Sequence, residues 1–112
     1  MGRTANSGAL TETVTYILLR LHRPAYGYAL MKDIAQMTDG RVKLGAGSLY
    51  GALDTLQKKG WIRALDEHPQ DRRIEYIITD TGKEYFEKEL LRLQELLKNA
   101  EKIKEVPYED DR

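Results

Sequence analysis

The 112-residue sequence contains no cysteine and no long apolar run. Without cysteine the chain cannot form disulfides, cysteine-ligated zinc sites, iron–sulfur clusters or a thiol nucleophile. No stretch approaches the roughly 18 apolar residues that span a membrane, and none opens the chain as a leader would, so we expect a cytoplasmic protein without a membrane partner. His22 and His68 have no neighbours of metal-ligand type, and no paired-carboxylate signature occurs. We therefore expect no enzyme activity, no cofactor and no metal.

Net charge is absent as well, because eighteen basic side chains balance eighteen acidic ones. Their distribution is uneven: residues 41–73 carry seven basic and four acidic side chains, whereas residues 74–112 carry seven and eleven. This places a positive field over the middle of the chain, as a nucleic-acid binder needs. The overall neutrality equally suits a module that binds another protein, and that alternative stays open.

A chain of this length forms one domain with one modest core. Its first half has the apolar periodicity of two amphipathic helices. Leu10, Val14, Ile17, Leu18 and Leu21 recur at helical spacing and predict a helix over residues 9–21, which ends before Pro24. A second helix is predicted over residues 27–37, followed by a turn at Asp39 and Gly40.

The stretch from Gly45 to Ile62 predicts a short helix with one buried face. Leu49, Leu53 and Leu56 are spaced by four and three residues, and Gly60 ends the helix. The opposite face is polar, which is typical of a helix whose free face reads a ligand. Residues 61–65 and 73–78 are rich in β-branched and aromatic side chains and predict an antiparallel hairpin with a projecting loop. Three helices followed by a hairpin is the order of a winged helix-turn-helix.

The last helix is predicted to run from the N-cap Thr79 to about Lys104. Its apolar residues are spaced by four, three, four and three, which is a coiled-coil repeat: Phe86, Leu90, Leu93, Leu97 and Ala100. A helix of about 25 residues is nearly 40 Å long, which exceeds what so small a domain covers. We therefore expect a second copy of the chain to cover its far half, the alternative being a helix folded back on its own domain.

The candidate DNA-binding residues lie on the third helix and in the hairpin loop. The outward residues of the helix are Ser48, Tyr50, Gly51, Asp54 and Lys58, and the loop supplies Gln70, Arg72 and Arg73. The N-terminus of a helix attracts a phosphate, and the missing side chain of Gly51 allows close approach to base edges. The Tyr50 hydroxyl is expected to donate to a phosphate, the alternative being a ring that caps the core. Arginines on a loop bind phosphates or are simply solvated.

Three blocks of sequence together resemble the PadR-like transcriptional regulators. They are Tyr26-Gly-Tyr-Ala-Leu30, the stretch from Gly47-Ser-Leu-Tyr50 to Gly60-Trp-Ile62, and the stretch from Arg72-Arg-Ile-Glu-Tyr76 to Thr79 and Gly82. The resemblance covers about residues 10–105, and the single last helix is similar to that of the small subfamily. It implies a homodimeric repressor that binds double-stranded DNA. From the residue patterns we expect a flexible arm (1–8), a winged helix-turn-helix (9–78), a dimerisation helix (79–105) and an acidic tail (106–112).

The same resemblance implies specific site residues and a small-molecule effector. Ser48, Tyr50, Arg72 and Arg73 match the DNA-contacting segments, and Tyr28 matches the aromatic residue that opens the second helix. Relatives that bind flat aromatic drugs at the dimer interface can use a tryptophan in the last helix, whereas this chain has leucines there. The departure argues against a drug-sandwich site and leaves an apolar pocket for a small apolar or aromatic effector, lined by Val14, Leu18, Leu90, Leu93 and Leu97.

Overall fold

The structure, a computed structural model, describes residues 8–65 and 73–109. The predictions for the N-terminal arm, for the hairpin loop with Gln70 and Arg72, and for the end of the acidic tail lie outside these residues. The elements follow in the order α1 (Glu12–Arg20), β1 (Ala25–Tyr26), α2 (Gly27–Met37), α3 (Ala46–Lys58), β2 (Ile62–Leu65), β3 (Glu75–Ile78) and α4 (Asp80–Glu105). The predicted fold class, mostly helical with a small hairpin and a long last helix, is confirmed.

Helix α1 begins three residues later than the apolar periodicity predicts. The Thr11 hydroxyl accepts a hydrogen bond from the backbone N–H of Val14 at 3.1 Å, so the chain is capped there and not at Ala9. Leu10 therefore precedes the helix. Its backbone N–H donates at 3.0 Å to the Glu89 carboxylate on α4, which holds the entering chain against the last helix.

Helix α2 spans the predicted residues, and the turn after it is formed as expected. Asp39 and Gly40 both have positive φ, at 53° and 81°, which reverses the chain toward α3. The buried Thr38 donates its hydroxyl proton to the Ile34 carbonyl and accepts from the Val42 N–H. These two bonds connect the turn to the last residues of α2.

The sheet contains one strand that the sequence did not predict. β1 pairs antiparallel with β3, with Ala25 opposite Tyr76, and β3 pairs antiparallel with β2, with Ile62 opposite Ile78, so the strand order is β1-β3-β2. The residues of β1 were interpreted as a simple connector. The pairing holds the start of α2 against the hairpin.

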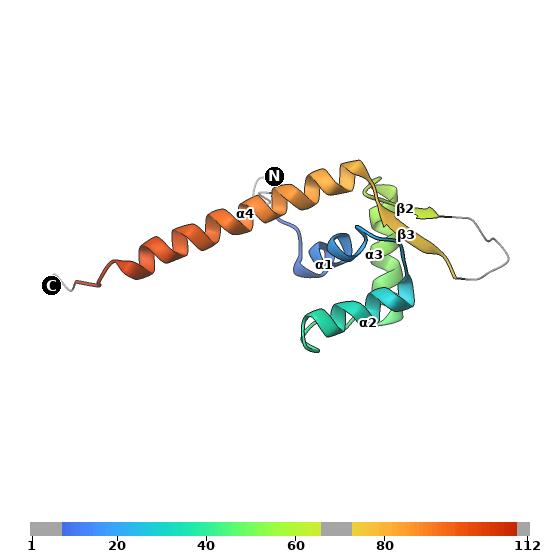
Figure 1. The fold of residues 1–112 in the computed structure, drawn as a ribbon, viewed down its shortest axis with the longest axis horizontal. Helices are drawn as coiled ribbons and strands as arrows, with labels where there is room; N and C mark the ends of the chain where they lie inside the picture. The colour runs from blue at the N-terminus through green and yellow to red at the C-terminus, as the bar shows by residue number, and fades with distance from the viewer. Residues whose placement is uncertain (1–7, 66–72, 110–112) are drawn as a thin grey trace.

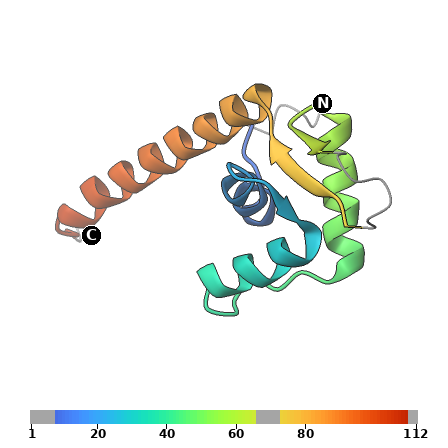
Figure 2. The same ribbon diagram turned by 45° about the vertical axis from the view of Figure 1, so that its right-hand side comes forward.

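The core lies where the helices and the sheet meet, and α4 extends away from it (Figure 1). Figure 2 shows that α4 passes over α1 and then continues as a free rod. The molecule measures 71 × 33 × 23 Å, so the alternative of an α4 folded back on its own domain is not what the structure shows. Among the described residues, no helix is both apolar and long enough to cross a membrane.

Candidate nucleic-acid interface

Helix α3 has a buried apolar stripe and an open polar stripe on opposite sides. Leu49, Leu53 and Leu56 are at most 2% exposed and face the core. At about 100° of rotation per residue, the positions directly opposite them form one line along the helix. This outward stripe consists of Gly47, Gly51, Asp54 and Lys58, all of them exposed.

The first half of the outward stripe has no side chains. A Cβ atom placed on Gly47 or Gly51 would have nothing within 4 Å, so the backbone itself forms the surface there. The N-cap of α3 is Gly45, which supplies no side-chain hydrogen bond to the first turn. The free N–H groups and the helix dipole favour an anion at this end.

The second half of the outward stripe carries an ion pair. Lys58 Nζ lies 3.0 Å from Asp54 Oδ2, and the two side chains are 77% and 63% exposed. An exposed pair at this spacing stabilises a helix by only about 0.3–0.5 kcal/mol. Its presence on this stripe is therefore of more interest for binding than for folding.

Two tyrosines that the sequence singled out lie on α3 and on α2, namely Tyr50 and Tyr28. The ring of Tyr50 lies over Gly27 at the start of α2: a Cβ on Gly27 would come within 2.4 Å of the Tyr50 hydroxyl. Tyr50 is nevertheless 48% exposed, so it packs between the two helices and still reaches the surface. Burial, and to a lesser extent Tyr50 nearby, raises the pKa of Tyr76. Tyr28 points outward and is 72% exposed.

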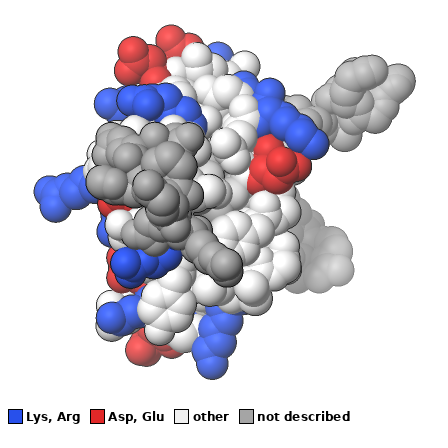
Figure 3. All heavy atoms as spheres, turned by 90° about the vertical axis from the view of Figure 1, so that its right-hand side faces the viewer, with Lys and Arg blue, Asp and Glu red and all other residues white. Residues whose placement is uncertain are grey.

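The hairpin adds Arg73 to this end of the molecule. Arg73 is exposed, and its guanidinium carbon lies 5.1 Å from the centre of the Tyr26 ring in a cation–π contact. Figure 3 views this end directly: basic side chains stand around the margin of the face, with acidic ones among them. On this face the described basic side chains therefore form no single continuous patch.

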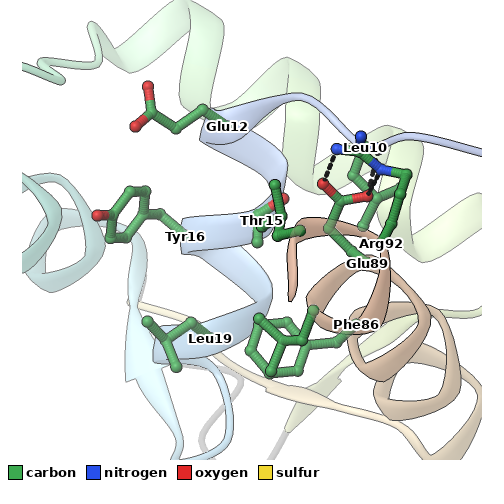
Figure 4. A pocket seen from close by; sticks show the side chains of 10 residues that line it. Leu10, Glu12, Thr15, Tyr16, Leu19, Phe86, Glu89 and Arg92 are labelled. Carbon is green, nitrogen blue, oxygen red and sulfur yellow. Dashed lines mark hydrogen bonds and ion pairs between the residues drawn. The ribbon is translucent and has the colours of Figure 1, made fainter. Parts of the chain in front are cut away.

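A second candidate site is the groove between α1 and α4, of about 570 Å³ (Figure 4). Its lining comes from both helices and from the chain before α1: Leu10, Glu12, Thr15, Tyr16, Leu19, Phe86, Glu89, Leu90, Arg92 and Leu93. Leu90 and Leu93 were predicted here. Val14, Leu18 and Leu97 were predicted as well, but they do not line this groove. Leu18 is 0% exposed in the core, and α1 presents Thr15, Tyr16 and Leu19 to the groove.

The predicted interface stripe of α4 divides into two parts. Phe86 is 5% exposed and packs mainly into the protomer's own core, although it also lines the groove. Beyond it the apolar residues become free of the domain: Leu93 is 40% exposed and Leu97 is 61% exposed, and Ala100 lies half-buried one turn further on.

Sequence reasoning missed the charged side chain that is most buried among the described residues. Glu89 is 3% exposed, and its carboxylate accepts hydrogen bonds from Leu10 N–H and Arg92 Nε, both at 3.0 Å, with Arg92 Nη2 on the other oxygen. Figure 4 shows the three groups together at one side of the groove. The hydrogen bond from Arg92 lowers the pKa of Glu89. At the groove's outer rim the exposed Glu12–Arg41 pair lowers the pKa of Glu12 in the same way.

The comparisons with known proteins agree with this geometry. A transcriptional regulator from Clostridium thermocellum has a similar structure, with a TM-score of 0.70 and 30% identity over 80% of this chain and 87% of that one. A PadR family transcriptional regulator from Eggerthella lenta also gives a TM-score of 0.70, with 27% identity over 84% and 82% of the two chains. An uncharacterised 37.1 kDa protein of transposon TN4556 from Streptomyces fradiae is 41% identical over 66 residues, or 59% of this chain.

The chain spans only 18% of the length of that transposon protein, so the latter adds nothing on function. The family model of the PadR-like transcriptional regulators matches residues 16–88, from the middle of α1 to the first turns of α4. This range contains α2, α3 and the hairpin, which are the elements described above. The chain therefore belongs to the PadR-like family, a family of transcriptional regulators and not of enzymes.

Proposed function

We propose that this protein is a sequence-specific repressor that binds a pseudo-palindromic operator as a homodimer and is released by a small apolar or aromatic effector. The observation that carries the proposal is the shape of α3, which buries three leucines and turns an open, polar stripe to solvent. Membership of a family of transcriptional regulators supports it. A helix of this kind fits the major groove of DNA.

In this proposal α3 enters the major groove with its outward stripe facing the bases. The glycines at positions 47 and 51 allow the backbone to approach closely. Ser48 and Tyr50 lie on the flanks of the stripe, where their hydroxyls reach phosphates. Arg73 binds the phosphate backbone of the DNA on the other side of the major groove, together with Gln70 and Arg72 of the hairpin loop.

The dimer would form along the exposed part of α4 and position the two recognition helices. Helices that read successive major grooves on one side of the duplex lie about 34 Å apart. The groove between α1 and α4 opens beside this surface, and its apolar lining suits a small apolar or aromatic effector. Such a molecule relieves repression only if it binds more tightly to a dimer whose α3 helices are wrongly spaced for the operator than to the dimer that fits the operator.

Footprinting and mobility shifts on the DNA upstream of the protein's own gene test the proposal. We expect a protected site whose affinity falls steeply as the salt concentration rises, because phosphate contacts release counterions. Tyr50→Phe keeps the ring over Gly27 and removes only the hydroxyl, so it should weaken DNA binding while folding and dimerisation stay intact. The absence of any protected site, together with a salt-insensitive protein partner, would favour the protein-interaction module.

A further inference from the structure

The second half of the outward stripe of α3 contains two side chains that can read a base edge. Gly47 and Gly51 contribute backbone only, and the neighbouring Thr55 hydroxyl donates its proton to the Gly51 carbonyl at 3.1 Å. Asp54 and Lys58 remain. Their carboxylate and ammonium groups lie side by side, 3.0 Å apart, and both are mostly exposed.

This ion pair presents a hydrogen-bond acceptor next to a donor. In the major groove a C·G pair presents the matching pattern, the N4 amino group of cytosine next to the O6 and N7 acceptors of guanine. An adenine amino group is also a donor, but it stands beside the N7 acceptor of its own ring, which repels a carboxylate. Where adenine has N7, cytosine has a C–H group, which does not repel a carboxylate. Guanine and thymine present only acceptors to Asp54.

We propose that Asp54 and Lys58 together read one C·G base pair in each half-site of the operator, an inference that rests on the proposed function. Asp54 accepts from cytosine N4, and Lys58 donates to guanine O6 and N7. Because the pair has no net charge, it adds little to the attraction for phosphates. Its effect is on choice of sequence, since the carboxylate disfavours every base that presents an acceptor to it.

Selection of bound duplexes from a randomised library, followed by sequencing, tests this inference on the full-length protein. The wild-type motif should contain a C·G pair at one position of each half-site. Asp54→Asn should move that position toward A·T, because an asparagine amide pairs with adenine N6 and N7. Asp54→Ala should weaken the preference for cytosine at this position by roughly 5- to 160-fold, as expected for the loss of one good base contact, and should leave only the preference of Lys58 for acceptor groups. All other positions should be unchanged.

Glu105→Gln is the matched control, because it removes the same charge at the far end of α4. It should leave the motif as in the wild type. If the wild type enriches a motif that neither Asp54 variant changes, the C·G assignment is wrong and the proposed function stands. If the wild type enriches no sequence at all, the proposed function fails and this inference fails with it. Circular dichroism confirms that each variant is folded.

Discussion

Single glycines determine how closely the elements of this protein approach each other. Gly82 in the first turn of α4 is buried at the junction with the hairpin, and a Cβ there would lie 2.1 Å from the Trp61 carbonyl oxygen and 2.8 Å from Ile78 Cγ1. A backbone oxygen cannot move aside as a side chain can. Gly82 is therefore required because the hairpin approaches it so closely, and not because of its backbone angle, since its φ is ordinary for a helix.

Gly82→Ala should destabilise the fold, at or above the upper end of the roughly 1–3 kcal/mol that overpacking costs. Urea unfolding at a fixed protein concentration measures the change. Gly47→Ala, at a helical glycine with open space around it, is the control and should not destabilise. Equal stability of the two variants would show that α4 does not dock as described.

Gly51→Ala should have opposite effects on folding and on DNA binding. The added methyl group meets nothing within 4 Å, and alanine in a helix is more favourable than glycine by about 0.5–1 kcal/mol, so the unfolding free energy should rise. In the proposed complex the same methyl group, on the outward stripe, would separate α3 from the bases. Mobility shifts should show weaker operator binding, and an affinity equal to that of the wild type would remove Gly51 from the interface.

At the scale of elements, the sequence predicted the helices and strands that depend on local residue patterns. Helix α2 and the hairpin follow from periodicity, turn residues and β-branched runs. β1 was missed because two residues, Ala25 and Tyr26, show no alternation, and only their pairing with β3 makes them a strand. The sequence did not show which face α1 turns to the groove, because α1 carries apolar residues on more than one side. In the structure Leu18 is buried in the core, whereas Leu19 lines the groove.

Glu89 could not be found from the sequence, because an acid between apolar positions of a helix is ordinarily solvent-exposed. Its burial depends on Leu10, which lies 79 residues earlier and donates its N–H to the carboxylate. The clamp of Glu89, Arg92 and Leu10 ties the chain entering α1 to α4. It therefore holds together the two helices that form the groove.

Glu89→Gln should lower the unfolding free energy by about 1–3 kcal/mol, the contribution of hydrogen bonds to a charged group. The pKa of Glu89 is lowered in the folded state. The stabilisation that its charge provides is therefore complete at neutral pH, well above the pKa of about 4.3 that a glutamate has in the unfolded chain. As the pH falls, the unfolded chain takes up a proton first, and the stabilisation is lost below that value. The gap between wild type and variant should thus narrow on acidification from pH 6 toward about pH 3.

Urea unfolding across this pH range, at constant protein concentration, measures that gap. Glu12 also has a lowered pKa, but it is unchanged in both proteins and cancels from the difference. A gap that stays constant with pH would mean that Glu89 contributes through packing and not through its charge.

At the scale of the whole molecule, two hydrogen bonds and a ring contact connect the segment that follows α3 to the start of α4. The Thr79 hydroxyl donates to the Gly60 carbonyl at 2.6 Å, and the Thr79 N–H donates to the Trp61 carbonyl at 2.9 Å. The Trp61 ring stacks on Tyr85 of α4 with 4.4 Å between ring centres. The direction of α4 is thereby set relative to the end of α3, so the way two α4 helices pair would set the spacing of two recognition helices.

Leu97→Lys should therefore convert the protein to a monomer and remove operator binding without unfolding it. Leu97 is 61% exposed on the apolar stripe of α4, so a charge there costs the isolated protomer little but opposes the packing of two helices. Leu91→Lys is the matched control: Leu91 is 64% exposed on the same helix, but about 120° around it from Leu97. Sedimentation should give a monomer for the first variant and a dimer for the second. Only the second should bind a two-half-site operator tightly, because a monomer engages one half-site and loses the linkage to the other. A Leu97→Lys protein that sediments as a dimer would place the interface elsewhere.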